Sequence, residues 1–97
     1  MPVSLKKVFD YIKRDLGLPS RLKFLVIDRR YGITLSQRKE VVTRGLESYL
    51  ANVSDSTRVG AFLPELERLV GAQVGAKIEI WYAGNRIDGR RSIAGLR

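Results

Sequence analysis

The sequence predicts an α+β fold, built as one small domain over residues 1–97 in the order helix, strand, helix, helix, strand, strand. Three stretches carry apolar residues at helical spacing, and two shorter stretches are apolar in the manner of β-strands. A chain of 97 residues suits one hydrophobic core. Hydrophobic residues at 44% and charged residues at 29% are typical of a chain that folds.

The first helix follows from a regular apolar stripe near the start of the chain. Ser4 is a suitable N-cap and Gly17 a suitable stop. The stripe consists of Leu5, Val8, Phe9, Ile12 and Leu16. Basic residues lie away from this stripe and are interpreted as a solvated helix face: Lys6, Lys7, Lys13 and Arg14.

The middle of the chain predicts a buried strand and then a long helix. Residues Leu22–Ile27 are apolar on both faces of an extended chain, as in a strand covered on both sides. Thr34 and Gln37 have the spacing of a capping box, so a second helix is expected from about Leu35 to Ala51. Gly45 within it indicates close packing of another element.

The last part predicts a third helix and a basic hairpin. Ser54 and Asp55 can cap a helix that ends at Gly71, and Pro64 means either that this helix is kinked or that it starts near Leu63. Residues 77–82 alternate like a strand, and Gly84-Asn85 and Asp88-Gly89 indicate turns. A short strand near Ser92–Ala94 and a frayed end are expected to follow.

The charge is strongly positive, with 18 Lys and Arg against 10 Asp and Glu, a net +8. Such a chain attracts phosphate polymers or anionic lipid. The sequence lacks Cys and His, which excludes disulfides, thiolate catalysis and Ser-His-Asp chemistry. We expect no cofactor and no metal. No stretch approaches the roughly 20 apolar residues of a membrane span, so we expect a cytoplasmic protein without a membrane partner.

The predicted order, and the segment from Leu46 to Val74, resemble the winged helix-turn-helix superfamily of DNA-binding proteins. The resemblance lies in a helix ending at Tyr49-Leu50, a turn at 52–54, and Ser54-Asp55-Ser56-Thr57-Arg58-Val59 opening the next helix. It implies that this helix enters the major groove by its first turns, and that the basic hairpin and tail over residues 85–97 form the wing. The contacts implied are Ser56, Thr57, Arg58, Arg86, Arg90 and Arg91.

Charge density indicates a second interface, which shares the hairpin with the first. Residues 21–44 carry seven basic and two acidic side chains, whereas residues 53–83 carry three and four. Phosphate is then expected on the loop at Arg29 and Arg30, on Arg38 and Lys39 at the start of the second helix, and on the hairpin. Both interpretations remain open.

The expected function is therefore nucleic-acid binding by a small transcriptional regulator, with DNA favoured over RNA and a homodimer conceivable through Trp81 and Tyr82. One alternative is a non-enzymatic interaction or assembly protein of viral or mobile-element origin. A more remote alternative is a metal-dependent nuclease using Asp28, with Glu79 and Asp88 near other strand ends. We expect no catalytic residues.

Overall fold

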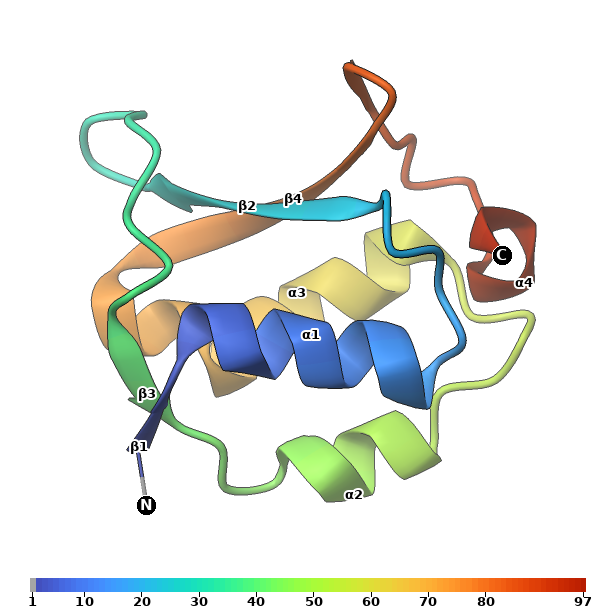
Figure 1. Cartoon of the computed structure of the whole chain (residues 1–97), viewed down its shortest axis with the longest axis horizontal. Coiled ribbons are helices and arrows are strands. Elements are labelled where there is room, and N and C mark those ends of the chain that lie inside the picture. Colours follow the sequence, from blue (N-terminus) through green and yellow to red (C-terminus); the bar gives the residue numbers. More distant parts are fainter. Residues whose placement is uncertain (1) are drawn as a thin grey trace.

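The computed structural model describes residues 2–97 and confirms the α+β class. Helices α1 and α3 lie on one side of an antiparallel three-stranded sheet in the order β2-β4-β5, and a separate two-stranded sheet joins β1 to β3 (Figure 1). The strands are β1 (Pro2–Ser4), β2 (Lys23–Asp28), β3 (Glu40–Val42), β4 (Ala76–Tyr82) and β5 (Asn85–Arg86). The helices are α1 (Leu5–Asp15), α2 (Leu46–Ala51), α3 (Val59–Leu69), the 3₁₀ helix η1 (Gly71–Val74) and α4 (Ile93–Leu96).

The first helix is confirmed, with its cap. The Ser4 hydroxyl accepts a hydrogen bond from the Lys7 amide, which satisfies one of the free donors of the first turn. The predicted apolar stripe is buried against the sheet and the other helices, and Phe9 stacks on Phe24 of β2 with ring centroids 4.7 Å apart. The opposite face of α1 is left to solvent.

The two long strands are also confirmed, and they form the central ladder. β2 and β4 pair antiparallel from Lys23 opposite Trp81 to Asp28 opposite Ala76. Phe24 and Val26 face the helices and are buried, whereas Leu25 and Ile27 on the other face are only partly buried. No helix among residues 2–97 covers that second face (Figure 1), so the expectation of a strand covered on both sides was wrong.

The predicted helix over Leu35–Ala51 is wrong, because this segment forms a loop, the strand β3 and only then the short helix α2. Gly45 has a backbone φ of 83°, a left-handed conformation that no right-handed helix can include, so it precedes α2 as its cap. Thr34 forms a β-bridge with Ile27 instead of capping a helix. The β-branched pair Val41 and Val42 lies in β3, opposite β1, a strand that we did not expect.

The third helix starts later than predicted, at Val59, because residues 54–57 form a turn of their own. The Ser54 amide donates to the Thr57 hydroxyl at 3.0 Å, and the Thr57 amide donates to the Ser54 carbonyl. One helix then runs through Pro64, so a start near Leu63 is excluded. It ends at Leu69, two residues before the predicted stop at Gly71.

The C-terminal end is ordered and helical, which corrects the expected strand and frayed tail. Ser92 caps α4 and forms a single bridge with Arg58. Ile93 and Leu96 are buried in the core. The Arg97 guanidinium donates to the Leu16 carbonyl at 2.9 Å and pairs with Asp55, so it links the end of α1 to the turn before α3.

The hairpin turn lies one residue earlier than expected. Ala83 and Gly84 occupy it, both with positive φ (52° and 81°), as in the tight two-residue turns that match the twist of a hairpin. Its return arm β5 has only two residues.

Candidate nucleic-acid interface

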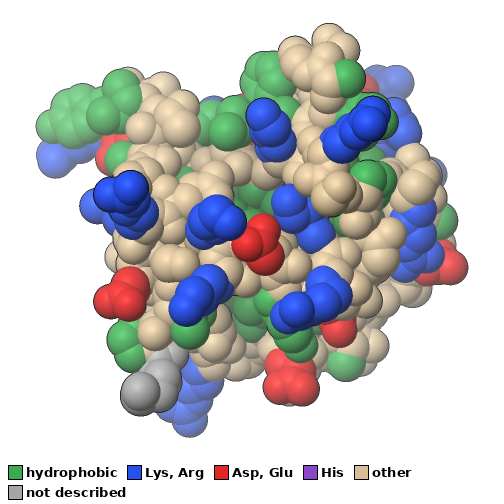
Figure 2. Space-filling view, in the orientation of Figure 1, with side chains coloured by type: hydrophobic (Ala, Val, Ile, Leu, Met, Phe, Trp, Pro, Cys, Tyr) green, Lys and Arg blue, Asp and Glu red, His purple; other side chains and the backbone are tan. Residues whose placement is uncertain are grey.

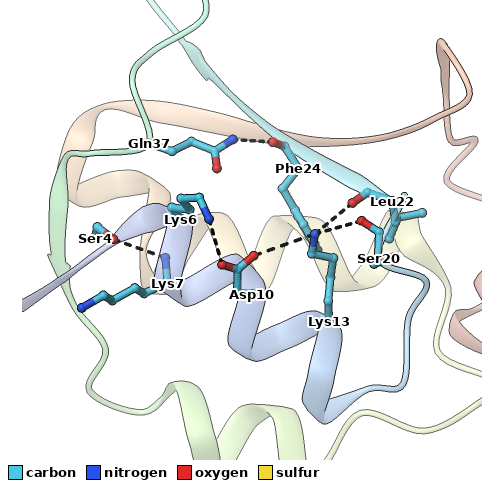
Figure 3. A network of polar contacts seen from close by, with 9 residues as sticks. All are labelled: Ser4, Lys6, Lys7, Asp10, Lys13, Ser20, Leu22, Phe24 and Gln37. Atoms are coloured by element: carbon cyan, nitrogen blue, oxygen red, sulfur yellow. Dashed lines mark hydrogen bonds and ion pairs between the residues drawn. The ribbon is translucent and has the colours of Figure 1, made fainter.

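The exposed face of α1 carries two parallel lines of basic side chains with one acid between them. Lys6 and Lys13 are seven residues apart, as are Lys7 and Arg14, so each line extends about 10.5 Å along the helix. Asp10 lies between the lines, 3.3 Å from the Lys6 ammonium and 3.9 Å from that of Lys13 (Figure 3). The face therefore has an excess of positive charge around a single carboxylate.

A loop from the middle of the chain extends this face past the start of α1. The Lys6 amide donates to the Gln37 carbonyl at 3.0 Å, and the Leu5 amide donates to the Lys39 carbonyl at 2.9 Å. These bonds satisfy two of the free donors at the helix start. They also place the exposed residues Arg38 and Lys39 beside Lys6.

The other end of α1 is joined to the segment that leads into β2. The Lys13 ammonium donates to the Leu22 carbonyl at 3.2 Å and to the Ser20 carbonyl at 3.4 Å (Figure 3). Lys13 is therefore partly buried and positions this segment, which carries the exposed residues Arg21 and Lys23.

Together these three segments form a continuous basic surface, which we name the cationic strip. Figure 2 shows Lys and Arg side chains gathered across this face, around an acidic side chain. The strip consists of Lys6, Lys7, Lys13, Arg14, Arg21, Lys23, Arg38 and Lys39. Within residues 2–97, six of these have no carboxylate within 4 Å, namely Lys7, Arg14, Arg21, Lys23, Arg38 and Lys39.

The chemistry of the strip suits it to binding anions. Its unpaired ammonium and guanidinium groups are exposed, so they remain hydrated and can exchange water for anionic oxygens at low desolvation cost. Cations spread over three segments suit a row of separate phosphates better than one small anion.

Two of the predicted contact residues, Arg38 and Lys39, belong to the strip. Arg29 and Arg30 lie elsewhere, in the loop after β2. Arg29 pairs with Glu67 at 2.7 Å, and Arg30 lies over the Tyr31 ring at 5.9 Å from its centroid. Arg86 is in β5 and pairs with Glu79 at 3.5 Å. The arginines of the loop and of the hairpin therefore stand apart from Arg38 and Lys39.

The remaining predicted contacts surround the start of α3. Gly60 donates to the Gly89 carbonyl and Val59 to the Arg91 carbonyl, so residues 89–91 cover the first turn of the helix. That turn is the part which the winged-helix resemblance brings into the major groove. Five predicted residues lie near it. The hydroxyls of Ser56 and Thr57 form hydrogen bonds with the Ser54 hydroxyl, and the Arg91 guanidinium donates to the Gly95 carbonyl. The side chains of Arg58 and Arg90 are exposed.

The acids proposed for a nuclease have structural partners. Asp28 accepts hydrogen bonds from the amides of Arg30 and Tyr31, both at 2.8 Å, and so shapes the loop after β2. Asp88 accepts from the Arg90 amide in the same way. Over residues 2–97 no three Asp or Glu side chains are grouped closely enough to hold a metal ion.

Sequence reasoning missed six members of the strip. The seven-residue repeats on the first helix were visible, but they were interpreted as an ordinary solvated face. Their meaning comes from the contacts with residues 37–39 and 20–22, which lie far away along the chain.

Comparison with known proteins finds no matching family model, no similar curated protein and no solved structure that matches this one. None of the helices within residues 2–97 is both long enough and apolar enough to cross a bilayer.

Proposed function

We propose that this chain binds nucleic acid, and that the cationic strip is the surface that contacts the phosphate backbone. The observation that carries the proposal is the set of eight Lys and Arg residues from three separate segments, which runs from the exposed face of α1, past Asp10, to the outer face of the sheet at Lys23. Six of them have no acidic partner within 4 Å among the described residues, so their charge is free to interact with an external anion.

The arrangement favours a polymer over a small anion. Lys7 and Arg14 are about 10.5 Å apart along the helix, a distance that spans about three nucleotide steps of one duplex strand at about 3.4 Å each. Arg38 and Lys39 beyond one end and Arg21 and Lys23 beyond the other lengthen the track. Contacts of this kind fix a protein on the backbone without reading sequence.

The proposal keeps the class of function expected from the sequence and changes the place of the interface. The start of α3 is covered by residues 89–91, whereas the strip is open to solvent. A regulatory role on DNA would then rest on backbone contacts of α1, with any sequence preference supplied by other residues.

A salt titration tests the proposal. Binding of a short labelled duplex is measured by fluorescence anisotropy between about 50 mM and about 200 mM salt, where each phosphate contact contributes about −0.9 to the log-log slope. The proposal predicts a slope of several units. Absence of binding at the lowest salt, or an affinity indifferent to salt, would contradict it.

A further inference from the structure

The outer face of the three-stranded sheet is a second exposed surface, and it borders the cationic strip at Arg21 and Lys23. Loop 29–33 and the turn at Ala83-Gly84 rise from opposite ends of the sheet on the side away from α1 and α3 (Figure 1). Between them the strand register places Lys23 opposite Trp81, Leu25 opposite Glu79 and Ile27 opposite Lys77. We call this face, which carries apolar and charged residues between the two raised segments, the saddle.

At one end of the saddle lies a hollow of about 480 Å³, within the range of sites that hold small ring systems. Its floor is apolar and aromatic, because Trp81 and Leu25 form it, and its rim is cationic through Arg21 and Lys23. The same two cations are the end of the cationic strip. The full lining is Arg21, Lys23, Leu25, Trp81, Tyr82, Ala83 and Gly84.

The polar groups around Trp81 are already satisfied by the protein. The indole Nε1 donates to Glu79 at 3.0 Å, and that carboxylate also meets Lys77 at 3.7 Å and Arg86 at 3.5 Å. The indole is held in one orientation and has no free donor. What it can still offer a ligand is its ring surface, which is only partly buried.

We infer that this hollow binds unpaired bases, which stack on Trp81 while the adjoining backbone lies on Arg21, Lys23 and the rest of the strip. The inference rests on the proposed nucleic-acid binding and specifies single-stranded nucleic acid as its preferred form. Aromatic platforms beside a cationic track are how proteins hold single strands, and stacking tolerates any base because every base has a π-face. A paired base inside a duplex cannot enter the hollow, because both of its faces are stacked.

Trp81 is the only tryptophan, so its fluorescence reports directly on the hollow. The full chain is titrated with single-stranded oligo(dT), with a duplex of equal length, and with inorganic polyphosphate, which supplies charge without bases. We expect oligo(dT) to quench the emission of Trp81, and we expect the duplex and polyphosphate to bind without quenching it.

Variants separate stacking from charge, with binding followed by the anisotropy of labelled DNA or, for polyphosphate, by competition. Trp81→Leu should weaken oligo(dT) binding about 5-fold or more and leave duplex and polyphosphate binding unchanged. Trp81→Phe should keep most of the affinity, since it retains an aromatic surface. This second variant also controls for a loss of folding in Trp81→Leu. Val42→Ala, which alters an exposed apolar residue on β3, is the matched control and should have no effect.

The outcomes distinguish the two proposals. If all three polymers bind and none quenches Trp81, or if Trp81→Leu weakens all of them equally, base stacking is overturned and backbone binding by the strip stands. If none of the polymers binds, the proposed function fails, and this inference fails with it. A concentration-dependent dimer that Trp81→Leu abolishes would assign the saddle to a second copy of the chain and overturn the inference.

Discussion

The side-chain amide of Gln37 donates a 2.6 Å hydrogen bond to the backbone carbonyl of Phe24, at the outer edge of β2 (Figure 3). This bond anchors the loop whose carbonyls at Gln37 and Lys39 accept from the start of α1. The position of Arg38 and Lys39 beside Lys6 is therefore secured by this side-chain bond together with the two backbone bonds to α1 and the pairing of β1 with β3.

Gln37→Ala should lower both stability and affinity for nucleic acid. The part-buried Phe24 carbonyl would lose this partner, which costs on the order of 1 kcal/mol of unfolding free energy. Binding should weaken because Arg38 and Lys39 are held less firmly once this bond is lost, although no charge is removed. Urea unfolding and anisotropy measure the two effects. An unchanged affinity in a destabilised, folded variant would show that the loop does not contribute to the strip.

Asp10→Asn should strengthen binding of nucleic acid. The substitution removes the carboxylate at the centre of the strip and releases Lys6 from its ion pair. Stability should hardly change, because exposed pairs of this spacing contribute only about 0.3–0.5 kcal/mol. Asp55→Asn serves as the control, because it also removes one negative charge, but from a carboxylate that pairs with Arg97 and not with a residue of the strip. Equal gains from the two variants would indicate that only net charge matters.

Gly45→Ala separates the structure from the helix expected over Leu35–Ala51. In a helix interior this change would stabilise the protein by about 1 kcal/mol. With φ at 83° it should instead destabilise it by about 1–2 kcal/mol, since alanine disfavours the left-handed region. The nearest atom to the new methyl group would be Leu69 Cδ2 at 3.6 Å, an ordinary contact, so the backbone effect is isolated. Urea unfolding gives the sign, and a stabilised variant would contradict the structure.

Tyr49 should make stability fall in alkali. Burial, and next the carboxylate of Glu65, raise the pKa of the Tyr49 phenol above 10.0. The folded state therefore keeps this proton more tightly than the unfolded chain does. The contribution of the Tyr49 proton to the free energy of unfolding is therefore complete below pH 10 and is lost as the pH rises beyond that value. Tyr49→Phe cannot titrate there, so the stability difference between wild type and variant should shrink from pH 7 to pH 11. A constant difference would show that the phenol is not coupled to folding.

Much of the fold could be predicted where local pattern and tertiary contact agree. The first helix has both a stripe and a cap within its own sequence, β2 is a run of apolar residues, and β4 alternates between apolar and charged residues. The segment 35–51 misled because Thr34 and Gln37 have capping-box spacing while their actual partners are Ile27 and Phe24. Those partners lie on a strand whose edge this segment covers, which no local pattern reveals.

The candidate site was predictable only in its charge. The sequence indicated a basic protein and two of the eight strip residues, Arg38 and Lys39, although for a helix that does not exist. It could not reveal that Lys13 reaches the Leu22 carbonyl or that the Lys39 carbonyl receives the Leu5 amide. These bonds create the surface, and they join residues brought together only by folding.

The most direct test of the cationic strip compares two double variants that each remove two positive charges. Lys7→Gln with Arg14→Gln alters the strip, and Arg58→Gln with Arg90→Gln alters the region that the winged-helix resemblance would place on DNA. All four side chains are exposed, and none has an acidic partner within 4 Å among residues 2–97. The salt dependence of duplex binding is measured for both, with folding checked by circular dichroism. We predict that the strip variant loses about 1.8 units of slope and most of the affinity, whereas the other changes little. The reverse order would contradict the account and return the interface to α3 and the hairpin, and equal losses would leave only diffuse charge.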